Sequence, residues 1–219
     1  MKKYLPILKK CPLFFNVSDE DLIIMLNCLG AKVDVFDKKY TIFNEGKPIK
    51  HMGILLSGKA QIIQMDFYGN KSIIANVEPG ELFAEAFACN NVTLPVSIVA
   101  DEKSEIMFIS SVHILHTCSN ACSFHNQLIY NLMKSLAEKN VAFYEKIEVT
   151  SKRTTREKLL TYLNLQAKKH GNSTFNIPFD RQGLADYLEV DRSGLSVEIG
   201  KLKKEGVIDS YKSSFKLLF

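Results

Sequence analysis

The stretch from Ser119 to Lys152 contains neither glycine nor proline, and its apolar residues recur at the spacing of paired helices. Successive apolar positions are separated by four, three, seven and four residues, the a/d heptad pattern of a coiled coil. We therefore expect a helix over about residues 119–149, roughly 45 Å long at 1.5 Å per residue. That length favours a dimer helix between two protein parts; the alternative is a long core helix within one domain. The predicted dimer interface comprises Ile129, Met133, Leu136, Asn140, Phe143 and Ile147.

Asn140 occupies the one core position of this pattern that is not apolar. A single buried Asn at an a position fixes the register of a coiled coil and favours dimers, at some cost in stability. We therefore expect Asn140 to pair with its symmetry mate in a second copy of the chain.

The composition is that of a globular protein. The 219 residues, 46% of them hydrophobic, suffice for one large domain or two small ones. No apolar run approaches the ~18 residues of a membrane span. Lys9 and Lys10 interrupt the apolar N-terminus, and no small-residue cleavage site follows. We therefore expect a cytoplasmic protein, whose five cysteines are free thiols because an odd number without a secretion signal argues against a disulfide framework.

The first half of the chain changes its periodicity. Residues 1–30 have helical character, with a capping box that begins at Ser18. In residues 31–110, short runs of β-branched and aromatic residues alternate with glycines, and residues 66–70 have the composition of a hairpin turn. Short strands at regular spacing predict a sandwich or a jelly-roll barrel. The regularly spaced glycines are Gly46, Gly58, Gly69 and Gly80.

The last third has the order helix, short strand, helix, tight turn, helix and hairpin. Asp180 and Asp191 are placed to cap its second and third helices. This order predicts a winged helix-turn-helix. From Val149 onward there are 13 Lys or Arg against 8 Asp or Glu, a net +5, whereas the remainder has 15 against 16, a net −1. Such segregated charge indicates a nucleic-acid-binding domain, and an unrelated small α+β domain, the alternative, would not explain it.

With these features together, the whole chain resembles the cyclic-AMP receptor/fumarate-nitrate regulator (CRP/FNR) family of bacterial transcription regulators. The resemblance rests on the barrel pattern with PGELFAE at residues 79–85, on the long helix, and on LADYLEVDRS at residues 184–193. The sequence LKKEGVI at residues 202–208 continues the last motif.

The resemblance implies an α+β chain with an N-terminal cyclic-nucleotide-binding-type jelly-roll barrel, a long dimerisation helix and a C-terminal winged helix-turn-helix. Residues 1–148 would hold the sensor barrel with the dimerisation helix, and residues 149–219 the DNA-binding domain. The implied protein is a homodimer in which an event in the barrel re-angles two domains that bind double-stranded DNA. RNA polymerase is a further expected partner.

The recognition helix is expected to span residues 191–204, with its groove-facing side opposite an inner apolar face. Arg192 in its first turn can read guanine O6 and N7, which is worth about 1–3 kcal/mol of discrimination; the alternative for Arg192 is a solvated surface charge. Relatives of the cyclic-AMP receptor type carry Arg, Glu and Arg on this side. Here Ser193 and Val197 replace the last two, so the palindromic operator should differ. The expected base-reading residues are Arg192, Ser193, Ser196 and Val197.

Other basic residues of the C-terminal domain are expected to contact DNA phosphates, which supplies affinity rather than sequence choice. Half of them are equally well explained as solvated charges. The set comprises Arg153, Arg156, Arg181, Lys201, Lys203, Lys204 and Lys212.

The residues expected to bind the effector differ most from the pattern of the family. Cyclic-nucleotide binders of this family carry a Glu for the ribose and an Arg-Ser pair for the phosphate. Glu85 stands for the Glu, but no basic residue lies between Lys71 and Lys103. A buried phosphate without a cation is poorly compensated, so we expect an unknown, less charged effector, or none, rather than cyclic AMP. The expected effector pocket comprises Phe83, Glu85, Ala86, Pro95, Val96 and Ser97.

Three His and two Cys gather between His113 and His125. Cys118 and Cys122 are four residues apart, on one face if the long helix has begun, and a helix N-terminus makes a thiol more reactive. These residues are candidates for redox sensing or, less favoured, for metal binding. The plain alternative is packing at the junction of barrel and helix. Only Cys11 and Cys28 lie near the N-terminus, which disfavours an iron–sulfur cluster there.

No enzyme is expected. Metal-dependent barrels of the cupin type place several His inside the barrel, but residues 31–110 contain only His51. The sequence also has no nucleophile–base motif and no phosphate loop. A third class, an effector-binding interaction module without DNA binding, is disfavoured by the basic C-terminal domain.

Overall fold

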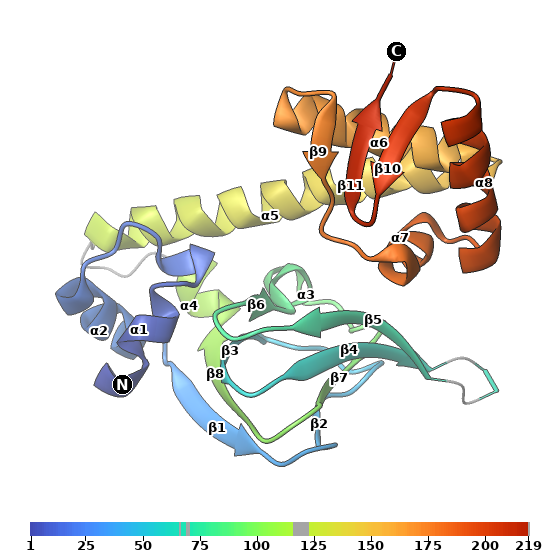
Figure 1. Cartoon of the computed structure of the whole chain (residues 1–219). Coiled ribbons are helices and arrows are strands. Elements are labelled where there is room, and N and C mark those ends of the chain that lie inside the picture. The colour runs from blue at the N-terminus through green and yellow to red at the C-terminus, as the bar shows by residue number, and fades with distance from the viewer. Residues whose placement is uncertain (66, 69–70, 116–122, 219) are drawn as a thin grey trace. The chain divides into compact units, whose positions relative to one another are not determined.

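The computed structural model describes residues 1–65, 67–68, 71–115 and 123–218. The chain divides into two units, Met1–Ala137 and Glu138–Phe219. The longest helix, α5 (Ser123–Thr150), contributes residues to both units (Figure 1). It covers the described part of the long helix expected from the sequence, since residues 119–122 lie outside the described residues.

The first unit contains two four-stranded sheets whose neighbouring strands are all antiparallel. One sheet has the order β1-β8-β3-β6, and the other β2-β7-β4-β5. This arrangement confirms the predicted barrel of short strands. The strands are β1 (Lys32–Phe36), β2 (Thr41–Phe43), β3 (His51–Ser57), β4 (Ala60–Met65), β5 (Lys71–Val77), β6 (Leu82–Phe83), β7 (Ser97–Ala100) and β8 (Ser104–Ser110).

Two of these strands escape the sequence pattern for identifiable reasons. Strand β1 lies at a sheet edge and lacks the apolar run of a buried strand; its alternation of Lys32 and Asp34 with apolar residues is a strand signal that a search for apolar runs misses. Strand β6 has two residues, too few for a periodicity. The hairpin turn expected at residues 66–70 lies mostly outside the described residues, but its flanking strands β4 and β5 pair as a hairpin requires.

The central strands β3 and β8 of the β1-β8-β3-β6 sheet are buried on both faces, and their side chains alternate between two apolar cores. In β3, Ile54 and Leu56 belong to one core and Leu55 to the other; in β8, Met107 and Ile106 divide in the same way. Successive residues of a strand point to opposite faces. The second core also receives Ala60, Val77 and Ile98 from β4, β5 and β7, so it lies between the two sheets.

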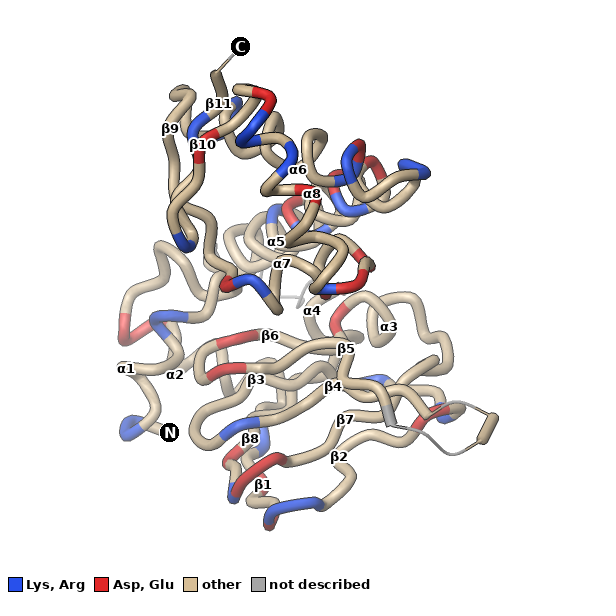
Figure 2. Tube along the Cα trace, turned by 45° about the vertical axis from the view of Figure 1, so that its right-hand side comes forward, with Lys and Arg blue, Asp and Glu red and all other residues tan. Residues whose placement is uncertain are grey.

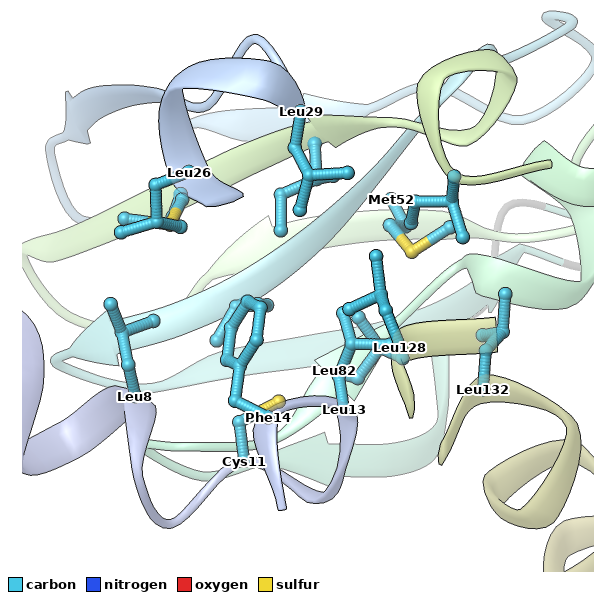
Figure 3. Close-up of a cluster of buried hydrophobic side chains, with 14 of the residues drawn as sticks. Leu8, Cys11, Leu13, Phe14, Leu26, Leu29, Met52, Leu82, Leu128 and Leu132 are labelled. Carbon is cyan, nitrogen blue, oxygen red and sulfur yellow. The ribbon is translucent and has the colours of Figure 1, made fainter. Parts of the chain in front are cut away.

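The N-terminal helices and the start of α5 cover the outer face of that sheet (Figure 3). Leu8, Leu13 and Phe14 pack with Met52 and with Leu128 of α5 in one continuous core, which we call the outer core. Ser18 accepts a hydrogen bond from the backbone N–H of Asp21, as the predicted cap requires. The helical elements of the first unit before α5 are η1 (Lys2–Tyr4), α1 (Leu5–Leu8), η2 (Pro12–Phe14), α2 (Asp19–Cys28), α3 (Glu85–Asn90) and α4 (Ser111–Leu115).

The second unit has the element order of the predicted winged helix-turn-helix. A three-stranded antiparallel sheet of order β10-β11-β9 packs with three helices around one apolar core, which includes Val149 from the last turn of α5. Its elements are α6 (Thr155–His170), β9 (Thr174–Asn176), α7 (Arg181–Leu188), α8 (Arg192–Lys204), β10 (Ile208–Tyr211) and β11 (Ser214–Leu217).

The helix ends of this unit follow from local sequence. Thr154 and Glu157 form a reciprocal capping box at the start of α6. Asp180 and Asp191 cap α7 and α8, and each accepts a hydrogen bond of 2.7 Å from the backbone N–H of a glycine three residues later. Both predicted aspartate caps are thus confirmed. None of the helices among the described residues is long and apolar enough to cross a membrane.

One buried polar atom of the second unit lacks compensation. The hydroxyl of Tyr162 is buried without a hydrogen-bond partner among the described residues, while its ring lies 5.1 Å from that of Tyr187 and 6.2 Å from that of Phe179. Burial, and then the nearby Tyr187, raise the pKa of Tyr162 above its usual range. Burying a hydroxyl without a partner costs free energy.

We therefore predict that Tyr162→Phe leaves the free energy of unfolding unchanged or raises it by about 1–2 kcal/mol. Tyr162→Leu, the control, should lower it by about 2 kcal/mol or more because it also removes the ring contacts. Urea unfolding of both variants measures the difference. A loss above about 1 kcal/mol for Tyr162→Phe would reveal a hydrogen bond and contradict the prediction.

Candidate nucleic-acid interface and sensor site

Helix α8 buries one side and exposes the other. Leu195, Ile199 and Leu202 lie in the core of the second unit, as predicted. The four residues expected to read bases are all exposed and lie away from that apolar side: Arg192, Ser193, Ser196 and Val197. The structure therefore brings the predicted base-reading residues together on the first two turns of α8.

These four residues differ in their local bonds. The hydroxyl of Ser193 donates to the Asp191 cap, and the hydroxyl of Ser196 donates to the carbonyl of Arg192 at 3.0 Å. Arg192 and Val197 have no hydrogen bond from their side chains to any other described residue. Of the four, Arg192 and Val197 are thus the ones whose side chains can meet a ligand without first giving up a bond within the helix.

Several basic residues expected to contact phosphates are ion-paired within the domain. Figure 2 marks the positions of Lys, Arg, Asp and Glu along the backbone. The two terminal nitrogens of Arg156 bind Glu205 at 3.0 and 2.5 Å, and Glu205 is the main cause of a raised pKa at Arg156. Lys203 binds Asp209 at 3.1 Å and the carbonyl of Ser210 at 2.7 Å. These two side chains tie α8 to α6 and to β10, so their first role is to hold the domain together. Lys201 lies 3.6 Å from Glu198 in a weaker pair.

Three other cations meet around the starts of α7 and α8. One terminal nitrogen of Arg181 lies 3.5 Å from the carbonyl oxygen of Lys212, and its guanidinium lies 5.6 Å from the ring centroid of Phe215. Burial, and then the positive charge of Arg192, lower the pKa of Arg181. Arg181 and Arg192 are therefore like charges close to one another, which an anion would stabilise. The ammonium group of Lys212 lies 5.6 Å from the ring centroid of Tyr211.

A short sequence motif that occurs twice marks this region. Residues 180–184 read DRQGL and residues 191–195 read DRSGL. In both segments the Asp caps a helix and the Arg is the first helical residue. The same local motif therefore places an arginine at the start of each of two adjacent helices. Arg153 and Lys204 are also exposed, and neither forms an ion pair with a described residue.

The residues expected to form an effector pocket do not all face one space. Phe83 is buried in the core between the sheets, Glu85 is buried at the start of α3, and Val96 packs against the outer core. Ala86 and Pro95 are exposed. The hydroxyl of Ser97 accepts a hydrogen bond of 3.0 Å from the backbone N–H of Glu45. Burial, followed by the charge of Glu85, raises the pKa of Cys89.

Four phenylalanine rings pack against one another between the two sheets. The ring centroid of Phe43 lies 6.2 Å from that of Phe83 and 5.6 Å from that of Phe108, which in turn lies 6.0 Å from that of Phe36. Gly53 of β3 makes room for this arrangement, because a Cβ atom there would lie 2.1 Å from a ring carbon of Phe83. The interior of the barrel is thus lined by edge-to-face aromatic contacts rather than by charge.

We predict that Gly53→Ala lowers the free energy of unfolding by about 1–3 kcal/mol, because the added methyl group overpacks the ring of Phe83. The same substitution in a Phe83→Ala background should cost far less, since the ring is gone. Urea unfolding of the two single variants and the double variant gives the coupling energy. An equal cost of Gly53→Ala in both backgrounds would show that Phe83 does not require the glycine.

The proposed thiol site lies outside the described residues. This holds for Cys118 and Cys122 and for the neighbouring His116. Of the other histidines in that segment, His113 lies beside Gly30, and Nε2 of the buried His125 is hydrogen-bonded to the carbonyl of Ile114 at 2.9 Å. Within residues 1–115 and 123–218, as far as they are described, no group of three His, Cys, Asp or Glu is arranged to hold a metal ion.

The expected dimer positions on α5 fall into two groups. Ile129 and Leu136 are half-buried and pack against the outer core of the first unit. Met133, Phe143 and Ile147 are between 61% and 66% exposed. Asn140 is also exposed. Only part of the apolar stripe of α5 is therefore buried against other described residues of the same chain.

Comparisons with known proteins bear on the fold. Residues 33–121 match the family of cyclic nucleotide-binding domains. Among solved structures, the catabolite activator protein of Thermus thermophilus is 20% identical over 94% of this chain and 93% of its own, with a TM-score of 0.50. CprK in complex with OCPA is 13% identical over 89% of each chain, with a TM-score of 0.61.

A third solved structure is that of CLP of Xanthomonas campestris, described as a c-di-GMP-responsive global regulator. It is 15% identical over 90% of this chain and 98% of its own, with a TM-score of 0.53. The search of curated protein sequences finds no match. At these identities the likeness concerns the fold.

These findings define a cyclic nucleotide-binding-type domain followed by a helical C-terminal region. The chain has the fold of these solved structures along about nine tenths of its length, and the fold that the resemblance implied is thus confirmed.

Proposed function

We propose that the protein is a homodimeric, sequence-specific DNA-binding transcription regulator that is controlled through its N-terminal barrel. The observation that carries this proposal is the exposed side of α8, where Arg192 and Val197 stand free at a helix start that also lies near Arg181. A recognition helix presents its first turns to base edges in the major groove, and nearby cations bind phosphates. The proposed domains are residues 1–148 and 149–219, and RNA polymerase is the proposed protein partner.

The roles of the basic residues follow from their partners. Arg181 and Arg192 are like charges close to one another, and Arg153, Lys204 and Lys212 form no ion pair with described residues; these five are the favoured DNA contacts. Arg156, Lys201 and Lys203 are occupied by carboxylates. A phosphate would have to compete with those carboxylates. We therefore assign the occupied residues mainly to holding α8 against its neighbours.

The proposed effector is a small molecule with little charge, and cyclic AMP is disfavoured. The region between Lys71 and Lys103 has no cation for a cyclic phosphate, and the space between the sheets is lined by aromatic rings. Regulation without a ligand, or by the thiols of Cys118 and Cys122, is the alternative. Because the chain is expected to contain free thiols, DNA binding is to be tested both with and without reductant.

We expect the purified protein to enrich a palindrome from random duplex DNA, and Arg192→Ala to relax the choice at one base pair in each half-site. Loss of one bidentate arginine–guanine contact corresponds to about 1–3 kcal/mol of discrimination. Lys168→Ala is the matched control, because it removes one exposed positive charge from the C-terminal end of α6. Selection is run with and without reductant, and enriched sites are sequenced.

Three outcomes test DNA binding and the role of Arg192. A palindrome altered by Arg192→Ala but not by Lys168→Ala supports the assignment of Arg192. The same palindrome with both variants would exclude Arg192 from base reading. No enrichment in either redox condition would count against DNA binding by the unliganded protein and favour the interaction-module alternative.

We also propose that two copies pair along α5 with Asn140 at their interface. Asn140→Ile should keep or raise the free energy of unfolding of the dimer while it loosens register or oligomeric state, because a buried Asn trades stability for specificity. Sedimentation equilibrium of the variant measures the oligomeric state. A variant that stays strictly dimeric and binds the same operator with unchanged half-site spacing would place Asn140 outside the paired core.

A further inference from the structure

Val197 is an exposed apolar side chain on the side of α8 that faces away from the core. It is 59% exposed, whereas Leu195, Ile199 and Leu202 are buried. At about 100° per residue, each of these three lies about 140–160° from Val197 around the helix axis. Val197 therefore stands at the middle of the outward side. A single exposed valine is common on protein surfaces, so the surroundings of Val197 decide what it can do.

The neighbours of Val197 one turn away in each direction include two glycines. Gly194 and Gly200 lie three residues before and after it and adjoin it on the helix surface. A Cβ atom at Gly200 would meet no atom of the described chain within 4 Å, and one at Gly194 would lie 3.6 Å from Oδ2 of Asp191, an ordinary contact. Glycine inside a helix, as at Gly200, is destabilising relative to alanine. Packing within the described chain thus does not require either glycine, and both leave Val197 uncovered.

The neighbours four residues away are bound to carboxylates. The hydroxyl of Ser193 donates to the Asp191 cap. The ammonium group of Lys201 lies 3.6 Å from a carboxylate oxygen of Glu198. Neither side chain therefore needs to lie across Val197, and the methyl groups of the valine are open to a ligand.

The chemistry of the base edges limits what a valine can recognise in the major groove. These edges present hydrogen-bond donors and acceptors, and thymine alone adds a methyl group at C5. A valine next to a polar edge would displace water without replacing its hydrogen bonds, which is unfavourable. Next to the thymine methyl group, it buries apolar surface on both partners. Because a β-branched side chain in a helix has one strongly preferred rotamer, Val197 loses little freedom in such a contact.

We propose that Val197 is a specificity-determining residue that selects one thymine in each half-site of the operator by packing against its 5-methyl group. The glycines beside Val197 let the groove edge come close to the helix. The inference rests on the proposed function, in which α8 enters the major groove, and deepens it by naming the group that is recognised. Arg192 selects through hydrogen bonds and Val197 through apolar contact, so the two residues select different bases.

The experiment removes the contact once from the protein and once from the DNA. Selection from random duplex DNA with the wild-type protein and with Val197→Ala locates the thymine, as the position where the variant no longer prefers a T·A pair. A second duplex carries deoxyuridine at that position in both half-sites, so that it lacks only the two methyl groups. Dissociation constants of the full-length proteins on both duplexes are measured at one salt concentration, because affinity for DNA depends steeply on salt.

We expect the wild-type protein to bind the deoxyuridine duplex about fifteenfold more weakly, which is roughly fourfold for each buried methyl group. Val197→Ala should bind the two duplexes equally, because its contact is already lost. Val35→Ala is the matched control and should behave as wild type. It removes the same two methyl groups from a valine that is 56% exposed on β1, in the other unit. Far-ultraviolet circular dichroism verifies that each variant is folded.

The outcomes distinguish this inference from the proposed function. A deoxyuridine penalty that is present in the wild type and absent in Val197→Ala establishes the contact. Equal wild-type affinity for the two duplexes, a penalty that persists in Val197→Ala, or an unchanged selected site with Val197→Ala overturns the inference and leaves DNA binding standing. If the wild-type protein enriches no duplex, the proposed function is overturned, and the role of Val197 with it.

Discussion

Helix α5 is fixed at its two ends to two different apolar cores, and this constraint organises the chain. Leu128 and Leu132 belong to the core of the first unit, whereas Val149 belongs to that of the second. Polar contacts reinforce both attachments: Asn131 is hydrogen-bonded to the carbonyls of Leu13 and Phe15, and Lys146 forms an ion pair of 3.3 Å with Glu189 beyond α7. Between the attachments, residues 137–144 are all exposed. Since these two helical turns have no core of their own, a partner surface is the natural stabiliser for them.

The first unit depends on one sheet that serves two cores at once. Because Ile54 and Leu55 point to opposite faces, the β1-β8-β3-β6 sheet joins the aromatic interior of the barrel to the core beneath the N-terminal helices. Leu128 of α5 lies in the latter core. Any change in how Phe43, Phe83 and Phe108 pack is therefore only one layer of side chains away from α5. That proximity gives a physical route by which an effector in the barrel would act on the helix.

Much of this fold is readable from sequence because local signals agree with it. The heptad stripe, the recurring glycines, and the caps at Asp180 and Asp191 each indicate an element that the structure contains. Strand β6 and the network around Asn131 could not be predicted. Their residues are too few or too distant in sequence, and only the packed structure brings the carbonyls of Leu13 and Phe15 to Asn131. The burial of the residues proposed for an effector pocket could not be read from sequence either, because Phe83 and Ala86 are near in sequence but differ in burial.

The sequence alone is also insufficient for the basic residues, because a count of Lys and Arg does not show which of them pair with carboxylates. From sequence, Arg156 and Arg181 are both expected to contact phosphates. In the structure Arg156 is ion-paired with Glu205 and Glu198, whereas Arg181 lies near the like charge of Arg192. Counting therefore overstates the number of residues available to DNA. What remains is Arg181 and Arg192, placed at the starts of α7 and α8 by a repeated Asp-Arg-x-Gly-Leu motif, together with Arg153, Lys204 and Lys212, which form no ion pair with a described residue. That set, rather than the net charge of +5, is the physical basis for assigning this domain to nucleic acid.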